Sequence, residues 1–184
     1  KTKLEGEKII LETLKSKSII LRSGLMIGTN DRFFNTFGSL CQISPFLPLI
    51  GRGLNYIQPI AVRDVARAVV EVLEKEEIKN NTYELGGPET FTFKELMEIL
   101  LKQIKKKRFL VPIPIPFAKV LGRVLGIMPK PLLSTDNVEL TQYDAIVSNK
   151  YKTIKDLKIS PKSINEVLPN YIWRFRKGGQ FAKL

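Results

Sequence analysis

One stretch decides the fold: Ser18-Ile19-Ile20-Leu21-Arg22-Ser23-Gly24-Leu25-Met26-Ile27. A short apolar run that ends in turn residues predicts a buried strand of the kind found in parallel sheets. The turn residues are Gly28-Thr29-Asn30-Asp31, which also offer an N-cap to the next element. Apolar side chains then recur at helical spacing and predict a helix: Phe33, Phe34, Phe37, Leu40 and Cys41.

The same alternation extends to both sides of this stretch. Lys1–Ser16 predicts a helix, and since no capping residue precedes it, we expect that the chain has lost its beginning. Gln58–Val62 and Thr82–Leu85 predict short strands, with a helix between them that Asp64 can cap. Ser44–Asn55 is rich in Pro and Gly and predicts a loop. Strands that alternate with helices indicate a parallel sheet with crossover helices.

From residue 92 onward, helices and proline-rich segments dominate. Thr92-Phe93-Lys94-Glu95 forms a capping box at the start of a helix. Phe109–Pro116 predicts an extended segment, and Phe117–Met128 a short amphipathic helix. Two further helix starts are predicted, one at Ser134 or Thr135 and running to about Tyr143, the other at Ser160-Pro161. We expect an α/β part at 1–90 and a smaller, mainly helical lobe at 91–184.

Composition excludes several kinds of chemistry. The sequence has no histidine, which excludes Ser-His-Asp and Cys-His catalysis and removes the commonest zinc ligand. Its one cysteine, Cys41, cannot form an internal disulfide and is expected to be a small buried hydrophobe. Gly51-Arg52-Gly53 is too short for a dinucleotide fingerprint. We expect no metal site and no catalytic residue.

The positive charge lies in the second half of the chain. The net charge is +12, and residues 94–130 and 150–184 each carry nine Lys or Arg against two Asp or Glu. Such an excess of positive charge favours one of three partners: an anionic membrane surface, an acidic protein or nucleic acid. The alternative is a solvated, lysine-rich surface with no such partner. The helix predicted at 117–128 fits an interfacial helix and a core helix equally well. The aromatic and basic tail from Tyr171 could stack on single-stranded nucleic acid. Nucleic acid is nevertheless the least favoured partner, because such tails also anchor to membranes and proteins.

The longest apolar tract is Phe109–Met128. Three prolines, Lys119 and Arg123 interrupt it, and a span needs about 20 mostly apolar residues. No transmembrane helix is therefore expected.

Several segments resemble extended and atypical short-chain dehydrogenases. The segment Lys1–Glu7 resembles the helix after the active-site tyrosine of that superfamily, and Gln58–Ala66 and Thr82–Glu89 resemble two later motifs. Three more segments are similar to the nucleotide-binding accessory subunits of respiratory complex I and their bacterial relatives: Arg32–Asn35, Ser44–Gly51 and Leu168–Arg176. The order and spacing of these segments support the resemblance, which covers nearly the whole chain.

The resemblance implies a fold and a set of site residues. The fold would be the C-terminal part of a Rossmann-like doubly wound parallel sheet, with 1–90 as the remnant of an NAD(P)-binding domain. Lys3 matches the lysine that holds the cofactor ribose in the superfamily, and its tyrosine would precede Lys1. The strand end Arg22-Ser23-Gly24-Leu25 would face the nicotinamide. Gln58 and Arg63 are candidates for a substrate cleft, with a solvated rim as the equal alternative. Asp64 is expected to be a helix cap rather than an acid–base group.

The resemblance also implies a role. The intact protein would bind NADP(H) or NAD(H), this chain weakly or not at all, and the role would be structural. Its partners would be complex I subunits, and it would lie peripherally on the cytoplasmic or matrix side of an energy-transducing inner membrane. Two alternatives stay open: part of an NAD(P)-dependent epimerase, dehydratase or reductase, and a basic module that binds membranes or nucleic acid.

Overall fold

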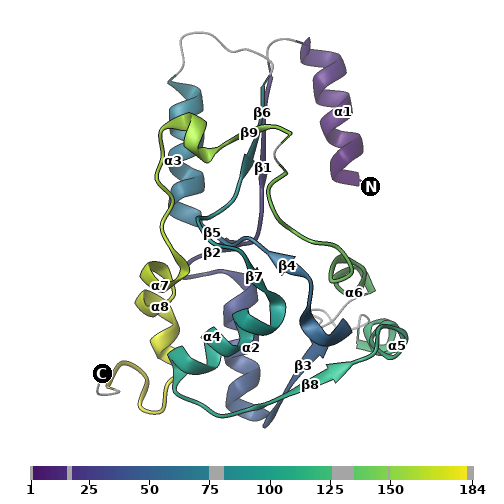
Figure 1. Ribbon diagram of the computed structural model, residues 1–184, viewed down its shortest axis with the longest axis vertical. Coiled ribbons are helices and arrows are strands. Elements are labelled where there is room, and N and C mark those ends of the chain that lie inside the picture. The colour runs from purple at the N-terminus through teal and green to yellow at the C-terminus, as the bar shows by residue number, and fades with distance from the viewer. Residues whose placement is uncertain (1, 16–17, 75–80, 126–134, 149, 182–184) are drawn as a thin grey trace.

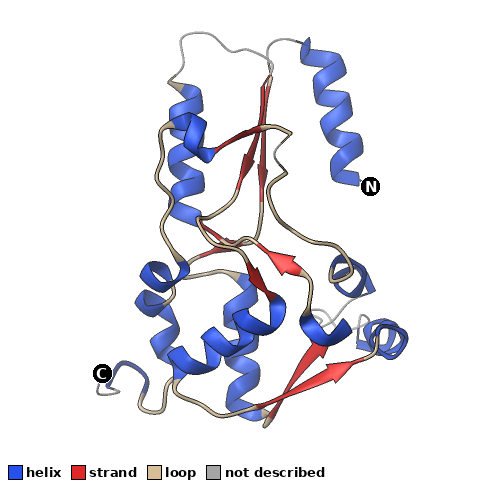
Figure 2. Cartoon of the chain, in the orientation of Figure 1, coloured by secondary structure: helices blue, strands red, loops and turns tan. Residues whose placement is uncertain are grey.

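The computed structural model describes residues 2–15, 18–74, 81–125, 135–148 and 150–181. The molecule is elongated (Figure 1). One end holds a small parallel sheet between two helices, and the other end holds a cluster of helices beside two-stranded sheets (Figure 2). The mixed, mainly parallel α/β architecture confirms the fold class expected from the sequence.

The parallel sheet has three strands in the order β1-β6-β9. They are β1 (Ile19–Ser23), β6 (Asn81–Leu85) and β9 (Lys152–Thr153), and all pairings are parallel. Helix α3 (Val62–Leu73), which follows β5 and precedes β6 in the chain, covers one face of this sheet. Its buried side chains pack with those of β6 and of the 3-10 turn Ile154–Leu157, forming a core of Ile60, Ala68, Val72, Tyr83, Leu85, Ile154, Leu157 and Ile159.

Helix α1 (Thr2–Leu14) lies on the other side of this sheet (Figure 1). Its apolar side chains are poorly covered: Leu4, Ile9, Ile10 and Leu14 are all exposed. The helix predicted at the start of the chain is therefore present, but these apolar side chains are exposed rather than packed against the rest of this chain.

A larger core lies at the opposite end, among helices α2 (Arg32–Ile43), α4 (Phe93–Ile104), α7 (Ile164–Val167) and α8 (Pro169–Ile172). Asp31 caps α2 by accepting from the Phe34 amide at 2.6 Å. The Thr92–Glu95 capping box opens α4 as predicted. Cys41 is fully buried in this core, as expected for a small hydrophobe.

Three two-stranded sheets complete the fold. Strand β2 (Met26–Ile27) pairs with β5 (Ile60–Ala61) in parallel, and β4 (Tyr56–Ile57) pairs with β7 (Phe91–Thr92) in antiparallel fashion. Strand β3 (Phe46–Ile50) pairs in parallel with β8 (Phe109–Ile113). Helices α5 (Ile115–Leu125) and α6 (Thr135–Leu140) lie beside this third pair. Short 3-10 turns lie at Gly51–Gly53, Trp173–Phe175 and Gly179–Phe181.

The strand predictions were partly wrong. Ser18–Ile27 is not one buried strand but two, β1 and β2, because the chain changes direction at Gly24, whose amide donates to the Leu85 carbonyl. Ser44–Asn55 is not a loop throughout, since it contains β3. Pro48 is tolerated there because a two-stranded pair leaves each strand one open edge, where a missing donor does no harm.

The helix starts also needed correction. Asp64 is not a cap: Ala61 occupies the N-cap position of α3, and Asp64 lies in its first turn, fully buried. The helix expected at Ser160-Pro161 begins at Ile164 instead, because Ser163 and Glu166 form a capping box there. Ser134 and the end of the segment predicted at 117–128 lie outside the described residues. The division of the chain at residue 90 stays a prediction.

Candidate functional site

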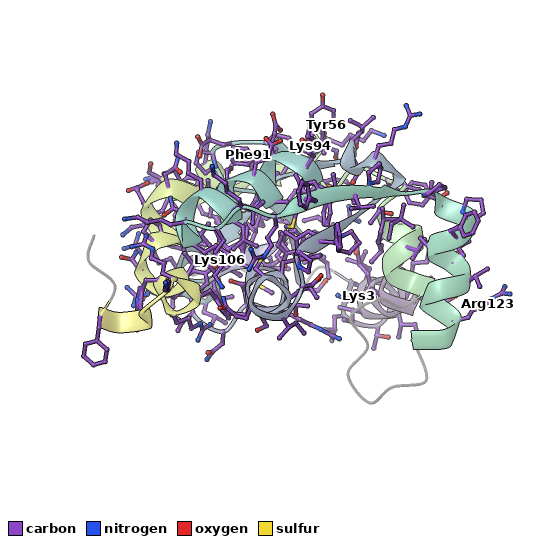
Figure 3. All side chains as sticks on the ribbon, turned by 90° about the horizontal axis from the view of Figure 1, so that it is seen from below. Lys3, Tyr56, Phe91, Lys94, Lys106 and Arg123 are labelled. Carbon is purple, nitrogen blue, oxygen red and sulfur yellow. The ribbon has the colours of Figure 1, made fainter. Side chains whose placement is uncertain are left out.

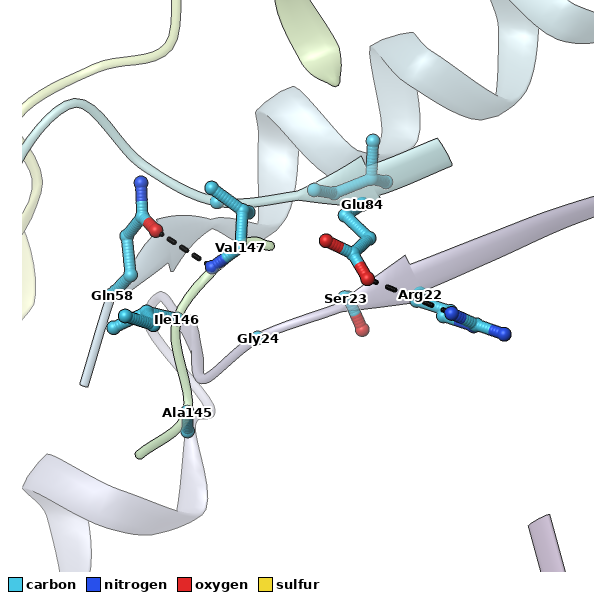
Figure 4. A pocket seen from close by; sticks show the side chains of 10 residues that line it. Arg22, Ser23, Gly24, Gln58, Glu84, Ala145, Ile146 and Val147 are labelled. Carbon is cyan, nitrogen blue, oxygen red and sulfur yellow. Dashed lines mark hydrogen bonds and ion pairs between the residues drawn. The ribbon is translucent and has the colours of Figure 1, made fainter. Parts of the chain in front are cut away.

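A cavity of about 170 Å³ lies at the carboxyl ends of β1 and β6 (Figure 4). In open α/β sheets, ligands bind outside the carboxyl ends of the parallel strands. The two strand ends, the β4–β5 turn and one later segment line it: Arg22, Ser23, Gly24, Gln58, Glu84, Leu85, Gly86, Ala145, Ile146 and Val147.

The later segment, residues 144–148, crosses the strand ends and is called the strap below. Backbone hydrogen bonds hold it against β4: the Ala145 amide donates to the Tyr56 carbonyl at 2.7 Å, and the Gln58 amide donates to the Ala145 carbonyl at 3.0 Å. The Asp144 carboxylate accepts from the Tyr56 amide at 2.8 Å. The strap is thus fixed as an extra strand-like segment, and it forms one wall of the cavity.

Gln58 closes the wall through its side chain. Its Nε2 donates to the Gly87 carbonyl at 2.7 Å, and its Oε1 accepts from the Val147 amide at 3.0 Å (Figure 4). Both ends of the amide are therefore engaged. Gln58 lines the cavity, and it also joins the strap to the turn after β6. Its role as a substrate-cleft residue stays a prediction.

Arg22 carries the charge of the site. It donates to Glu7 of α1 through Nη2 at 2.5 Å and Nε at 3.1 Å, and it lies 3.6 Å from Glu84. Its guanidinium stacks 4.4 Å from the centroid of the Tyr151 ring. The hydrogen bonds to Glu7 and then to Tyr151 raise the pKa of Arg22 above its ordinary value. Arg22 is a fixed cation between two carboxylates.

Glu84 has two partners of its own. Besides Arg22, it accepts from the Ser148 amide at 2.5 Å. The carboxylate therefore anchors the far end of the strap and is neutralised by the guanidinium. Glu84, the carboxylate among the described lining residues, is therefore engaged both by a cation and by a backbone amide.

Glycines allow the strand ends to approach the β4–β5 turn. A Cβ on Gly24 would lie 2.9 Å from the Gln58 carbonyl oxygen, and one on Gly87 would lie 1.9 Å from the Pro59 carbonyl oxygen. Both contacts are too short for any side chain. The Gly86-Gly87-Pro88 turn seen in the sequence is thus a packing requirement of this cavity.

The structure brings together four of the predicted site residues: Arg22, Ser23, Gly24 and Gln58. The other three do not line the cavity. Lys3 is exposed on the first turn of α1, Arg63 is exposed on α3, and Leu25 packs partly against the larger core while its carbonyl accepts from Ile60. The roles suggested for these residues stay predictions.

Sequence reasoning missed Glu84, Gly86 and the strap. Gly86 was visible as a turn directly after a predicted strand, and that position could have placed it at the sheet's ligand-binding edge. Glu84 and the strap carry no motif. In the described residues, no group of three His, Cys, Asp or Glu side chains could hold a metal ion.

No known protein-family profile matches the chain. Among curated proteins, the chain is 33% identical to the mitochondrial NADH dehydrogenase [ubiquinone] 1 alpha subcomplex subunit 9 of Arabidopsis thaliana, over 97% of the chain and 47% of that protein. It is 29% identical to the mitochondrial NADH-ubiquinone oxidoreductase 40 kDa subunit of Neurospora crassa, over 98% of the chain and 47% of that protein. The chain thus spans about half the length of these relatives.

Solved structures share the fold. The dTDP-glucose 4,6-dehydratase of Bacillus anthracis, in complex with NAD, matches with a TM-score of 0.66 and 19% identity, over 93% of this chain and 49% of that one. The corresponding enzyme of Streptomyces venezuelae, with NAD bound, matches with a TM-score of 0.63 and 17% identity, over 95% and 48%. The sequence and structural matches are compatible: over about half of their length, this chain is a homologue of these subunits of mitochondrial NADH-ubiquinone oxidoreductase, and it shares the fold of the two NAD-bound dehydratases.

Proposed function

We propose that this chain is part of a nucleotide-binding accessory subunit of a complex I-type respiratory assembly. It would bind NADP(H) or NAD(H) only together with the rest of the fold, and its role would be structural. The observation that carries this proposal is the position of the cavity at the carboxyl ends of β1 and β6, where a doubly wound sheet takes its ligand.

Two further observations support a structural role. The charged groups at the cavity, Arg22 and Glu84, are committed to holding α1 and the strap. The tail that resembles the complex I subunits most specifically is tied into the core, because Tyr171 and Ile172 are buried there. Because Arg22 and Glu84 make contacts within the chain, they fit a site that holds a nucleotide better than one that catalyses its reaction.

Titration with NADPH and NADH tests the nucleotide part of this proposal. Calorimetry on this chain should show weak binding or none, whereas the full-length Arabidopsis relative, titrated in parallel, should bind one of the two tightly. Tight binding by the 184-residue chain alone would contradict the proposal. So would turnover of NAD(P)H by the full-length relative with nucleotide sugars or their keto forms, which would favour the epimerase, dehydratase or reductase alternative.

A peripheral position on an anionic membrane is the second part of the proposal. Exposed apolar side chains lie on four elements, α2, β3, β8 and α5, and we call them the apolar ridge: Ile43, Phe46, Phe109, Phe117 and Val120. Ile43, Phe109 and Phe117 are 83%, 71% and 73% exposed, and the rings of Phe46 and Phe109 lie 5.9 Å apart.

Basic side chains accompany the apolar ridge. Lys105 and Lys107 precede β8, and Lys119 and Arg123 belong to α5. Figure 3 looks onto this end of the molecule and shows Lys106 and Arg123 on opposite sides of it. Exposed aromatic residues among lysines and arginines fit the boundary between anionic headgroups and acyl chains. In the described residues, no helix is long and apolar enough to cross a bilayer.

Flotation with vesicles tests this second part. The chain should float with vesicles that contain phosphatidylglycerol and not with pure phosphatidylcholine, and the binding should weaken with salt. A Phe109→Ser/Phe117→Ser double variant should lose most of the binding. Leu73→Ser is the matched control, since Leu73 is 75% exposed on α3 at the other end of the molecule. Equal flotation of both variants, or none by the parent chain, would refute the membrane role.

A further inference from the structure

Arg52 has a backbone conformation that suits glycine and strains any other residue. Its φ is +69° and its ψ is −3°, and it lies between Gly51 at φ +59° and Gly53 at φ +67°. Glycine adopts this left-handed region freely, whereas the Cβ of another residue crowds the following carbonyl oxygen. The turn therefore has three successive left-handed residues, and its middle position would be less strained with glycine.

The other described residues of this kind have an ordinary explanation. Besides Arg52, the non-glycine residues with a positive φ are Lys15, Lys105 and Lys158. Each directly follows a helix or a 3-10 turn, where a left-handed residue is common because its amide satisfies the last carbonyls. Arg52 instead belongs to the connection between β3 and β4. Strain that no such cap explains is a reason to look for a function of the side chain.

The side chain of Arg52 is exposed and available to a partner. Within the part of the chain that the structure describes, its guanidinium forms no ion pair and no hydrogen bond. A guanidinium can donate two parallel hydrogen bonds to one carboxylate, so this arginine has unused capacity to bind an anionic group.

Exposed apolar side chains accompany Arg52. Leu54 is 60% exposed and Tyr56 is 49% exposed on the same connection, and Tyr143, before the strap, is 71% exposed. The adjacent Asp144 brings Tyr143 to this place, because its carboxylate accepts from the Tyr56 amide at 2.8 Å. We call Arg52, Leu54, Tyr56 and Tyr143 the arginine–tyrosine patch.

The backbone beneath this patch is fixed by close packing. Gly53 is buried, and a Cβ on it would lie 3.2 Å from the amide nitrogen of Lys94 in the first turn of α4. The Phe93 amide donates to the Asn55 carbonyl at 3.1 Å. A partner would therefore meet side chains on a preformed backbone, which lowers the entropy lost on binding.

The patch resembles a protein–protein interface more than a small-molecule site. Arginine and tyrosine are enriched among the residues that contribute most to binding between proteins. Small molecules bind in concave sites, and none of the four side chains lines the cavity at the strand ends or the hollow between Leu11 and β6. The exposed guanidinium and the apolar side chains together match a carboxylate with apolar neighbours.

We propose that the arginine–tyrosine patch docks an acidic segment of another protein. A carboxylate of that segment would bind Arg52, and its apolar side chains would cover Leu54, Tyr56 and Tyr143. In the respiratory assembly proposed for this chain, the other protein is a second subunit, so this identity of the partner rests on the proposed function. The patch shares no residue with the cavity or with the apolar ridge.

Arg52→Gly tests whether the strained arginine serves binding or folding. Since glycine is unstrained at this position, the variant should unfold at a urea concentration no lower than the parent chain. The matched control is Lys158→Gly, which replaces another exposed cation at φ +58°. A clearly lower urea midpoint for Arg52→Gly would show that Arg52 supports the fold, and it would overturn the proposal.

Photocrosslinking tests the docking itself. The photoreactive residue p-benzoylphenylalanine replaces Tyr56 in the protein within its own cells, which are irradiated before the respiratory complexes are isolated. We expect a crosslink to a peptide of another protein that carries Asp or Glu beside apolar residues. Arg52→Gly should lower its yield by about fivefold or more, and Lys158→Gly should not. The same photoreactive residue in place of Leu73, exposed on α3, should not give this crosslink.

Several outcomes would overturn the docking proposal. They are no crosslink from position 56, a crosslink only to lipid, nucleotide or a second copy, a peptide without a carboxylate, and a yield that Arg52→Gly leaves unchanged. The same preparation also shows whether the protein purifies with NADH-oxidising activity. Its absence from that fraction would contradict the proposed function, whereas a crosslink that depends on Arg52 would still support the docking of an acidic segment.

Discussion

The hydroxyl of Tyr171 donates a hydrogen bond to the carboxylate of Asp31 across 140 residues of sequence. Asp31 is the N-cap of α2 and accepts from the Phe34 amide at the same time. Arg174, one turn further along the tail, donates to the Thr29 carbonyl at 2.6 Å. The last helical turns of the chain are thereby fixed to the turn that follows β2, so the tail is part of the core that shapes this end of the molecule.

Removing this hydroxyl should weaken the fold, and most clearly below pH 10. Burial, and next the hydrogen bond to Asp31, raise the pKa of Tyr171 above its ordinary value. The folded state therefore holds the phenolic proton more tightly than the unfolded chain, so this contribution is complete below the unfolded pKa of about 10 and is lost as the pH rises above it. Tyr171→Phe should cost about 1–2 kcal/mol near pH 8. Urea unfolding of both proteins from pH 7 to 11 should show the gap closing, and a gap independent of pH would contradict this account.

Asp64 should matter for stability although it does not line the cavity. It is 1% exposed, accepts from the Lys162 amide at 2.8 Å and lies 3.6 Å from Arg67. It thus joins α3 to the segment before α7. Asp64→Ala would remove the charged acceptor of this partly buried hydrogen bond and should cost about 1.5–3 kcal/mol in urea unfolding. Asp64→Asn keeps an acceptor and should lose less, and Glu74→Ala, at the exposed end of α3, should change little.

The fold was largely predictable because its signals are local. The helix stripe beginning at Phe33 and the Thr92 capping box need only neighbours in sequence, and both are present. Strand β3 was missed because Pro48 argues against a strand, and only its pairing with β8, more than 60 residues away, explains why a strand forms. Asp64 was misassigned for the same reason, since its partner Lys162 is distant.

The site was predictable where it follows the strand ends. Ser23, Gly24 and Gln58 could be named because the resemblance marks the carboxyl ends of the strands, where α/β folds bind ligands. The strap could not be named, since nothing in Ala145-Ile146-Val147 indicates that its backbone would pair with Tyr56 and Gln58. Lys3 carries a matching motif, but it lies on a helix held to the sheet mainly through Glu7 and Arg22.

That ion pair should determine how firmly α1 is held. Arg22→Lys keeps the charge but loses the two-pronged contact with Glu7 and the flat stacking on Tyr151, so it is not a conservative change here. We expect the amides of α1 to exchange several-fold faster in Arg22→Lys and in Glu7→Gln, while those of α4 stay unchanged. Lys94→Ala, which removes an exposed pair with Glu98, is the control. Equal protection of α1 in all variants would show that other contacts hold the helix.

Two glycines should respond oppositely to the same substitution. Gly6 lies inside α1 with nothing within 4 Å of an added Cβ, and alanine is about 1 kcal/mol more favourable than glycine in a helix interior. Gly6→Ala should therefore raise the helix content and slow the exchange of α1.

A Cβ on Gly87 would meet the Pro59 carbonyl oxygen at 1.9 Å, so the β4–β5 turn would have to move. Gly87→Ala should cost roughly 3 kcal/mol in thermal or urea unfolding, as overpacking does at a backbone contact. It should also perturb the amide of Val147, because Gln58 joins that residue to the same turn. A Gly87→Ala protein with unchanged stability and an unchanged Val147 amide would mean that the strand ends do not pack against the turn as described, and the cavity would then lose the wall that gives it its shape.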